Sequence, residues 1–278
     1  MTNKVLILGS GTSTGIPIPG CFCKVCQSTN PKNKRLRTSI ILKFKNDDKK
    51  GHPEKKLLID TTPDLRQGLL DHQINSLDGV IITHTHADHV HGIDDLRPLC
   101  FGNPSKTIPL YTYPKAKEEL LHRFPYIFNS LKKRPNIGGG IPLLEIKTLN
   151  LDKPVSLLEK PFNFFLLPHG YGKTLGFCQG KFAYLIDCHD IPSQTLQFLK
   201  EQQLDLLIID CVCLKPHKTH LNIEKAFSFI KAIAPQRAGL IHMGHELDHN
   251  ELQKRGEASF DFPVFPLADG MVLEYCDE

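Results

Sequence analysis

The segment IITHTHADHVHG, residues 81–92, decides the fold. Four histidines and one aspartate fall within the eight positions from His84 to His91, directly after the apolar run Val80–Ile82. An apolar run that stops at polar residues predicts a buried strand leading into a functional loop. Imidazole and carboxylate are preferred ligands of divalent metals such as zinc. The segment therefore predicts a metal site at the end of a strand.

The spacing within this segment predicts ligands for two ions. His84 and His86 lie two residues apart, so in an extended segment both side chains point to the same side and can reach one metal. Asp88 and His89 follow in the turn, where we expect them to reach a second metal a few ångströms away. One short loop would then supply part of two coordination shells.

Further candidate ligands stand at the ends of other apolar runs. His169 follows FFLLP, Asp187 follows FAYLI, and His242 follows AGLI. If these strand ends converge, they complete the metal site. Asp60 follows LLI in the same way, and we expect it to hold a ligand histidine through the second ring nitrogen.

Alternating strand and helix patterns run through the chain. Apolar runs rich in Ile, Leu, Val and Phe predict strands, and apolar stripes at helical spacing predict helices between them. The predicted strands are Val5–Leu8, Ser39–Phe44, Leu57–Asp60, Val80–Thr83, Ile108–Tyr111, Phe162–Leu167, Phe182–Asp187, Leu204–Asp210, Ala238–His242 and Met271–Tyr275. The predicted helices are Pro63–Gln73, Lys115–Leu121, Ser193–Gln202, Ile223–Ala234 and Glu246–Arg255. This order indicates an α/β fold of two packed sheets with helices outside.

Composition limits the classes of function. The formal net charge of +4 permits an anionic substrate but does not favour nucleic-acid binding, since no dense Lys/Arg stripe with aromatic residues is present. No apolar run approaches the roughly 20 residues that span a bilayer, and the apolar part of MTNKVLILGSG is too short for a signal peptide. We therefore expect a cytoplasmic protein without membrane contact. Nine cysteines, an odd number, favour reduced thiols and a metal site over a disulfide framework.

The motif THTHADH, with His169, Asp187 and His242 downstream, resembles the metallo-β-lactamase superfamily of dinuclear metal hydrolases. The resemblance covers nearly the whole chain, 1–278, as one domain, and implies a four-layer αββα sandwich of two mixed β-sheets with the site at one edge. It implies that one metal is held by His84, His86 and His169, that the other is held by Asp88, His89 and His242, and that Asp187 bridges the two ions.

The N-terminal segment GSGTSTGIPIPGCFCKVC resembles PhnP-like phosphodiesterases, which hydrolyse cyclic phosphates. In that group three cysteines and a distant histidine bind a further, structural zinc. The matching positions are Cys21, Cys23 and Cys26, in the loop 20–27, and His245. Three thiolates and one imidazole make a closed tetrahedral zinc site that would order this loop. The chain is thus expected to hold two Zn or Mn ions in the active site and one structural Zn.

These resemblances imply a phosphodiesterase that acts on a small, in some relatives cyclic, phosphodiester. Two metals would share a bridging hydroxide, because bound zinc lowers the pKa of water from 15.7 to about 7. His220, in HKTHLNIEKAF before a predicted helix, is the candidate general acid, and His217 on the same loop is its rival.

Several alternatives stay open on sequence grounds. A tRNA 3′-processing endoribonuclease and a thioester hydrolase of the glyoxalase II kind share the histidine motif, as does a β-lactamase. A metal-bearing binding protein without hydrolysis is a fourth possibility. The loop 125–142 is either a lid over the site or a plain connector. Family likeness alone suggests a homodimer. Arg35 and Arg37 are interpreted as a solvated edge.

Overall fold

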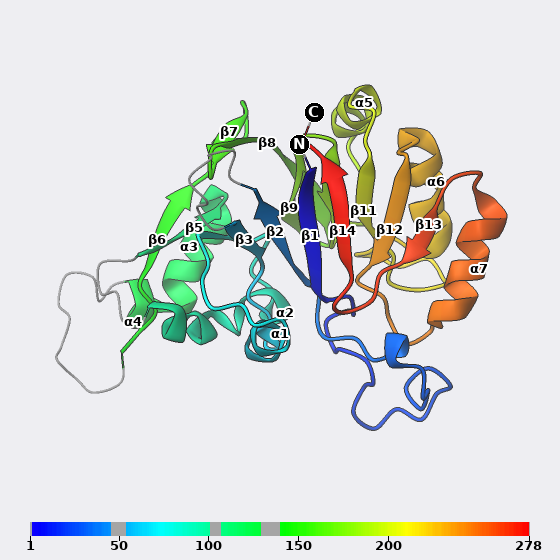
Figure 1. Ribbon diagram of the computed structural model, residues 1–278, viewed down its shortest axis with the longest axis horizontal. Helices are drawn as coiled ribbons and strands as arrows, with labels where there is room; N and C mark the ends of the chain where they lie inside the picture. The colour runs from blue at the N-terminus through cyan, green and yellow to red at the C-terminus, as the bar shows by residue number, and fades with distance from the viewer. Residues whose placement is uncertain (1, 46–53, 101–106, 129–139, 278) are drawn as a thin grey trace.

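The computed structural model describes residues 2–45, 54–100, 107–128 and 140–277. Two seven-stranded mixed sheets pack face to face (Figure 1). The first sheet has the order β14 (Val272–Cys276), β1 (Thr2–Gly9), β2 (Ser39–Phe44), β3 (Lys55–Ile59), β4 (Gly79–Ile81), β5 (Ile108–Thr112) and β6 (Leu144–Thr148). The second has the order β13 (Val264–Pro266), β12 (Arg237–Ile241), β11 (Leu206–Asp210), β10 (Phe182–Leu185), β9 (Gly172–Gln179), β8 (Lys160–His169) and β7 (Val155–Leu157).

Both sheets combine antiparallel and parallel strands in the same way. In the first sheet β14, β1, β2 and β3 pair antiparallel, and β3 to β6 pair parallel. In the second sheet β7 to β10 pair antiparallel, and β10 to β13 pair parallel. Because parallel strands end at one edge of a sheet, the loops after β3, β4, β10, β11 and β12 gather there.

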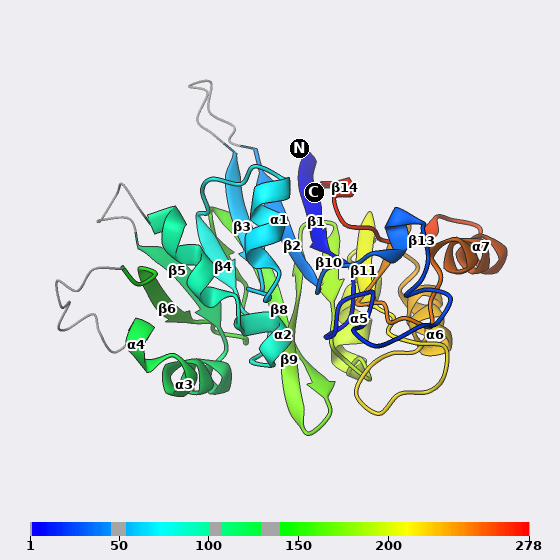
Figure 2. The ribbon, with the colours of Figure 1, turned by 90° about the horizontal axis from the view of Figure 1, so that it is seen from below.

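Helices cover the outer face of each sheet, so the predicted four-layer αββα architecture is confirmed. Figures 1 and 2 show the first four α-helices on the side of the first sheet and the last three on the side of the second. The helices are α1 (Leu65–Asp71), α2 (Ala87–Val90), α3 (Pro114–Arg123), α4 (Pro125–Phe128), α5 (Ser193–Glu201), α6 (Ile223–Ile233) and α7 (His249–Ser259), with 3₁₀ segments at Pro31–Asn33 and Ile93–Cys100.

Three apolar layers hold these elements together. Between the sheets, aromatic rings such as Phe162, Phe177 and Tyr184 pack against aliphatic side chains of the first sheet, including Ile40. Two further clusters lie under the helices, one on the outer face of each sheet. Successive side chains along a strand point to opposite faces of the sheet. Because both faces are covered, both sets of side chains are buried, and the strands read as nearly continuous apolar runs.

The boundaries of one predicted helix are wrong. The helix expected at 246–255 begins at His249 and extends to Ser259, because the Asp248 side chain caps it by accepting hydrogen bonds from the backbone N–H groups of Asn250 and Glu251. The sequence reading also missed β6, β7, β9 and β13. Of the loop 125–142, residues 125–128 form α4, and 129–139 lie outside the described residues, so its role as a lid stays a prediction.

Candidate metal centre

Three of the predicted residues lie just beyond buried strands in left-handed backbone conformation. The φ angles of Asp60, Asp187 and His242 are 64°, 47° and 63°. This conformation is costly for a residue with a side chain, although Asp and His tolerate it better than most. Three such residues at neighbouring strand ends mark a functional edge of the two sheets.

His84, His86 and His169 come together at this edge. Each offers a ring nitrogen within 4.8 Å of those of the other two. His86 Nδ1 lies 3.1 Å from His169 Nε2. His86 is extended (φ −62°, ψ 154°), so it and His84 point to the same side as their spacing predicted. The carbonyl of Thr219 lies 2.9 Å from His169 Nδ1 and fixes that ring.

Asp187 is the centre of the second group. Its two carboxylate oxygens lie 2.8 Å from His89 Nε2 and 3.0 Å from His242 Nε2. Asp88 approaches the same His89 nitrogen at 3.2 Å. Together with His84, His86 and His169, these four residues form what we call the histidine cluster. All seven residues expected from the sequence are therefore adjacent.

The histidine cluster has the donor atoms that a divalent cation requires. His84 Nε2, His89 Nε2, His242 Nε2 and Asp187 Oδ2 are buried and have no hydrogen-bond partner among the described residues. The short approaches to Asp187 are therefore close contacts without hydrogen-bond geometry. An unsatisfied buried polar atom costs about 1–3 kcal/mol. Four of them facing one another fit a site for metal ions, which would coordinate all four.

Outer hydrogen bonds orient the ligand rings. His89 Nδ1 lies 2.7 Å from Asp60 Oδ2, as expected for a residue that supports a ligand. Asp60 in turn accepts hydrogen bonds from the backbone N–H and the hydroxyl of Thr83, both at 2.7 Å. Burial raises the pKa of Asp60, against the influence of His89. His242 Nδ1 contacts the Thr38 hydroxyl at 3.1 Å.

His220 lies against the cluster with a carboxylate partner that sequence reasoning missed. Its Nδ1 is 3.0 Å from Asp210 Oδ2 and 3.3 Å from Asp187 Oδ1. Burial alone would lower the pKa of His220, but the two carboxylates raise it to about 9. Asp210 ends the buried strand β11, so the strand-end pattern that identified Asp187 would also have found it. The rival His217 is exposed and contacts Thr219.

A cavity of about 780 Å³ opens onto the histidine cluster. Beyond the ligands and His220, most of its walls come from α3 and from the β8–β9 hairpin, and Ser13, Thr85, Tyr113 and Thr219 complete them. These walls carry three cations, Lys115, Arg123 and Lys173, and one carboxylate, Glu119. Glu119 accepts a short hydrogen bond from the Thr85 hydroxyl, and Arg123 donates to the Thr85 carbonyl at 2.6 Å. The wall away from the ligands is thus net positive.

The second predicted site, which we call the cysteine cluster, brings together Cys21, Cys23, Cys26 and His245. Their sulfur and ring-nitrogen atoms all lie within 4.8 Å of one another, and His245 Nδ1 is 3.2, 3.6 and 3.9 Å from the three sulfurs in that order. Tetrahedral zinc with Zn–S of about 2.3 Å and Zn–N of about 2.0 Å requires S···N separations of roughly 3.5 Å. The backbone N–H of Cys26 lowers the pKa of Cys23 to about 6, whereas burial raises the pKa of Cys26 to about 11. The four residues fit a closed zinc site.

Arg35 holds the chain around His245, which corrects the expectation of a solvated edge. Its side chain is 2% exposed and donates to the carbonyls of Gly244 and Leu247 at 3.1 and 2.7 Å. These acceptors are more than 200 residues away in sequence, so no local pattern signals the burial of Arg35. Arg37 is only partly buried and pairs with Asp64.

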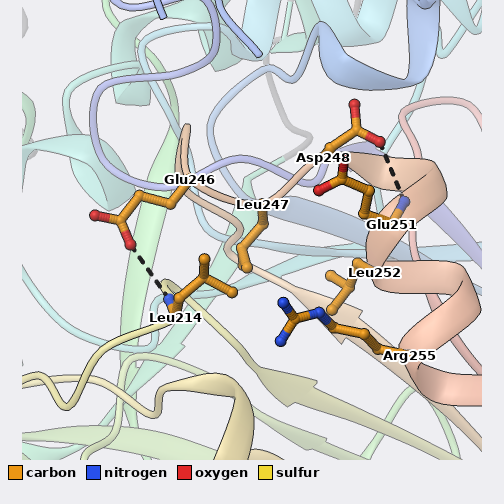
Figure 3. A pocket seen from close by; sticks show the side chains of 7 residues that line it. All are labelled: Leu214, Glu246, Leu247, Asp248, Glu251, Leu252 and Arg255. Carbon is orange, nitrogen blue, oxygen red and sulfur yellow. Dashed lines mark hydrogen bonds between the residues drawn. The ribbon is translucent and has the colours of Figure 1, made fainter. Parts of the chain in front are cut away.

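The residues after His245 are anchored on two sides. Glu246 accepts a hydrogen bond from the backbone N–H of Leu214, and Asp248 caps α7 (Figure 3). The hollow between Leu214 and α7 has a volume of only about 20 Å³. It has room for roughly one water molecule, so the cavity at the histidine cluster is the better substrate site.

Comparison with known proteins shows which family this architecture resembles. A family described as beta-lactamase superfamily domain matches residues 55–243. The crystal structure of a diphosphatase from the PhnP family superposes with a TM-score of 0.85 and 32% identity, over 99% of this chain and 97% of that one. Zinc-bound PqqB from Methylobacterium extorquens superposes with a TM-score of 0.76 over 97% and 99% of the two chains; at 18% identity this shows the fold alone.

A curated relative carries a different name. The octanoyltransferase of Porphyromonas gingivalis is 35% identical over 242 residues, which make up 87% of this chain and 46% of that protein. This chain therefore spans at most about half the length of the curated relatives that it matches. Among the described residues, no helix is both long and apolar enough to cross a membrane.

Proposed function

The chain belongs to the β-lactamase superfamily, and on that premise we propose that it is a metal-dependent phosphodiesterase acting on a small phosphodiester, cyclic phosphates included. The observation that carries this proposal is the position of His220. An imidazole with an acidic partner lies beside the histidine cluster, in the cavity where a scissile phosphate would bind. Likeness to a PhnP-family diphosphatase supports phosphorus chemistry.

Two metal ions fit the histidine cluster, with His84, His86 and His169 around one and Asp88, His89 and His242 around the other. Asp187, whose two oxygens face His89 and His242, is suited to bridge them. When bound, such ions activate water at neutral pH and neutralise charge on a phosphate. Zinc or manganese would suit these ligands, and zinc suits the cysteine cluster.

His220 is placed to protonate the leaving oxygen. Asp210 accepts the hydrogen bond from Nδ1–H, so a second proton on the ring would be carried by Nε2, from which it can be donated to the substrate. In its imidazolium form the ring would donate a proton to the leaving oxygen and stabilise the oxyanion that develops there. Asp210 fixes the ring orientation without itself touching the substrate.

The cationic wall favours an anionic substrate. Lys115, Arg123 and Lys173 outnumber Glu119 on the part of the cavity beyond the ligands. Within the described residues, no carboxylate oxygen lies within 4 Å of the charged nitrogens of these three cations. Their charge is thus available to attract a phosphodiester, and this attraction weakens with added salt.

Acyl transfer is the second candidate, because one relative is named octanoyltransferase. That name belongs to a protein of which this chain spans 46%. Acyl transfer by a covalent route needs a nucleophile such as a thiol beside a base. The described residues that line the cavity include the hydroxyl of Ser13 but no cysteine, and six of the seven candidate metal ligands line it. Hydrolysis at a metal centre accounts for these ligands, and covalent acyl transfer does not.

One substrate panel distinguishes these functions. Metal-loaded protein is assayed with bis(p-nitrophenyl) phosphate, 2′,3′-cyclic nucleotides, a precursor tRNA, a hydroxyacyl thioester, an octanoyl thioester and a β-lactam. We expect turnover of the first two substrates above that of the others. Turnover confined to a thioester, to tRNA or to the β-lactam would replace the proposed function, and no turnover by fully metallated protein would favour a binding protein.

A further inference from the structure

The β8–β9 hairpin places a solvent-exposed aromatic ring at the mouth of the cavity. Tyr171 lines the cavity and is more exposed than any other large apolar or aromatic side chain described, at 112% of its reference area. A tyrosine ring that buries so little apolar surface contributes little to the stability of the fold. Its position two residues after His169 makes it available to a substrate bound at the histidine cluster.

The turn that carries Tyr171 is short and lies close to a neighbouring loop. It is a two-residue hairpin turn, with His169 paired to Gly172 and with Gly170 at φ +55°, an arrangement that hairpins favour. A side chain on Gly170 would approach Thr219 to 3.2 Å, so the turn lies directly against the loop of His220. Figure 2 shows this hairpin projecting beyond the neighbouring strands.

Two hydrogen bonds fix the hairpin from opposite sides. His169 Nδ1 lies 2.9 Å from the Thr219 carbonyl, and the Tyr113 hydroxyl donates to the Lys173 carbonyl at 2.8 Å. Tyr113 precedes α3, so the hairpin is tied to both walls of the cavity. These contacts fix the position of the Tyr171 backbone at the cavity, so that a ligand has only the side chain to order.

The cavity is also larger than a phosphate group requires. Its volume of about 780 Å³ is within the range of roughly 300–1,000 Å³ for pockets that enclose a whole small-molecule ligand. The cationic side chains Lys115 and Lys173 suit the anionic part of such a ligand, and Tyr171 at the rim suits a flat apolar part. A nucleotide combines both features in one molecule.

We propose that Tyr171 stacks on the base of a small nucleotide whose phosphate lies at the histidine cluster, so that Tyr171 sets the preference for nucleoside-containing substrates. The inference rests on the proposed function, because it takes this cavity as the substrate site. Base stacking on aromatic side chains tolerates different bases, so the preference applies to nucleotides as a class. Tyr171 acts on specificity and leaves the metal ligands unchanged.

The test is a binding measurement, so its outcome is independent of turnover. Ribose 5-phosphate carries an anomeric hydroxyl where AMP carries adenine, and the dissociation constants of both for metal-loaded protein are measured by titration calorimetry. We expect AMP to bind about tenfold tighter or more, which corresponds to about 1.4 kcal/mol. Tyr171→Ala should reduce this preference to threefold or less, whereas Tyr171→Phe should retain it.

Two controls separate stacking from a disturbed site. Tyr126→Ala removes another exposed tyrosine, outside the cavity, and should leave the preference unchanged. Metal content and the affinity for ribose 5-phosphate should be the same in Tyr171→Ala as in the unaltered protein. Equal binding of AMP and ribose 5-phosphate by the unaltered protein, or an equal loss of both in Tyr171→Ala, would overturn the proposal. Absence of phosphodiester hydrolysis with the AMP preference intact would instead overturn the proposed function alone.

Discussion

The histidine cluster and the cysteine cluster are built in opposite ways. Ligands of the histidine cluster sit on strand ends and on the turn after β4, and most are almost fully buried. The three thiols of the cysteine cluster lie on an irregular loop and are partly exposed. Ligands on strand ends are held in place by the fold before a metal binds, whereas ligands on an irregular loop are ordered by the metal. We therefore expect the first to govern activity and the second to govern stability.

The segment between His242 and His245 connects the two clusters. His242 contacts Asp187, and three residues later His245 faces the cysteines. Met243 pairs with the N-terminal loop: its carbonyl accepts from Thr12, and its N–H donates to Ser10. The clusters therefore share a backbone segment but no ligand. Variants in one cluster test whether metal binding at the other cluster depends on it.

Replacing Asp187 should produce the largest effect. Asp187→Ala removes both oxygens that face His89 and His242, and with them the cluster's capacity for two ions. Metal-assisted charge neutralisation contributes several kcal/mol, so we expect turnover of bis(p-nitrophenyl) phosphate to fall about 10⁴-fold or more. Metal analysis should show that the cysteine cluster keeps its zinc. Loss of all metal would mean that the clusters are not independent.

His220→Ala should lower activity next most strongly, while both clusters keep their metals. Loss of an acid–base group typically costs about 10²–10⁴-fold in turnover. His217→Ala on the same loop is the matched control and should have little effect, because His217 is exposed. Activity that survives in His220→Ala but falls in His217→Ala would transfer the role of acid to His217.

Asp60→Asn should weaken metal binding without removing a ligand. The amide keeps the shape of the side chain but loses the charge that holds His89 Nδ1. Changes of this kind cost about 10–100-fold in metal affinity. Competition with a chelator measures the effect. An unchanged affinity would show that burial alone orients His89.

Cys23→Ser should affect stability more than activity. It removes one thiolate of four ligands, so we expect loss of about one metal equivalent and less than about tenfold loss of turnover. The melting temperature should fall by about 5 °C or more, since each kcal/mol corresponds to about 2–4 °C for a chain of this size. Cys213→Ser, at a partly exposed thiol outside both clusters, is the control. A loss of turnover as large as that of Asp187→Ala would contradict the division of roles.

The two clusters also differ in how far the sequence predicts them. His84 to His89 are neighbours in sequence, and His169, Asp187 and His242 are each recognisable as a polar residue after an apolar run. The cysteine cluster was inferred from family likeness, since no local pattern relates Cys21 to a histidine more than 200 residues away. Contacts such as that of Arg35 with Gly244 depend on the packing of distant segments, so they were missed. Strand β9 was missed as well, because its Gly and Cys residues interrupt the apolar pattern.

Metal stoichiometry tests the central claim most directly, namely that this chain carries a two-ion histidine cluster and a separate cysteine cluster. Zinc per chain is measured by mass spectrometry on purified protein, on Asp187→Ala and on Cys23→Ser. We predict about three equivalents for the unaltered chain, about one for Asp187→Ala and about two for Cys23→Ser. One equivalent or none in the unaltered chain after loading with zinc would contradict the account.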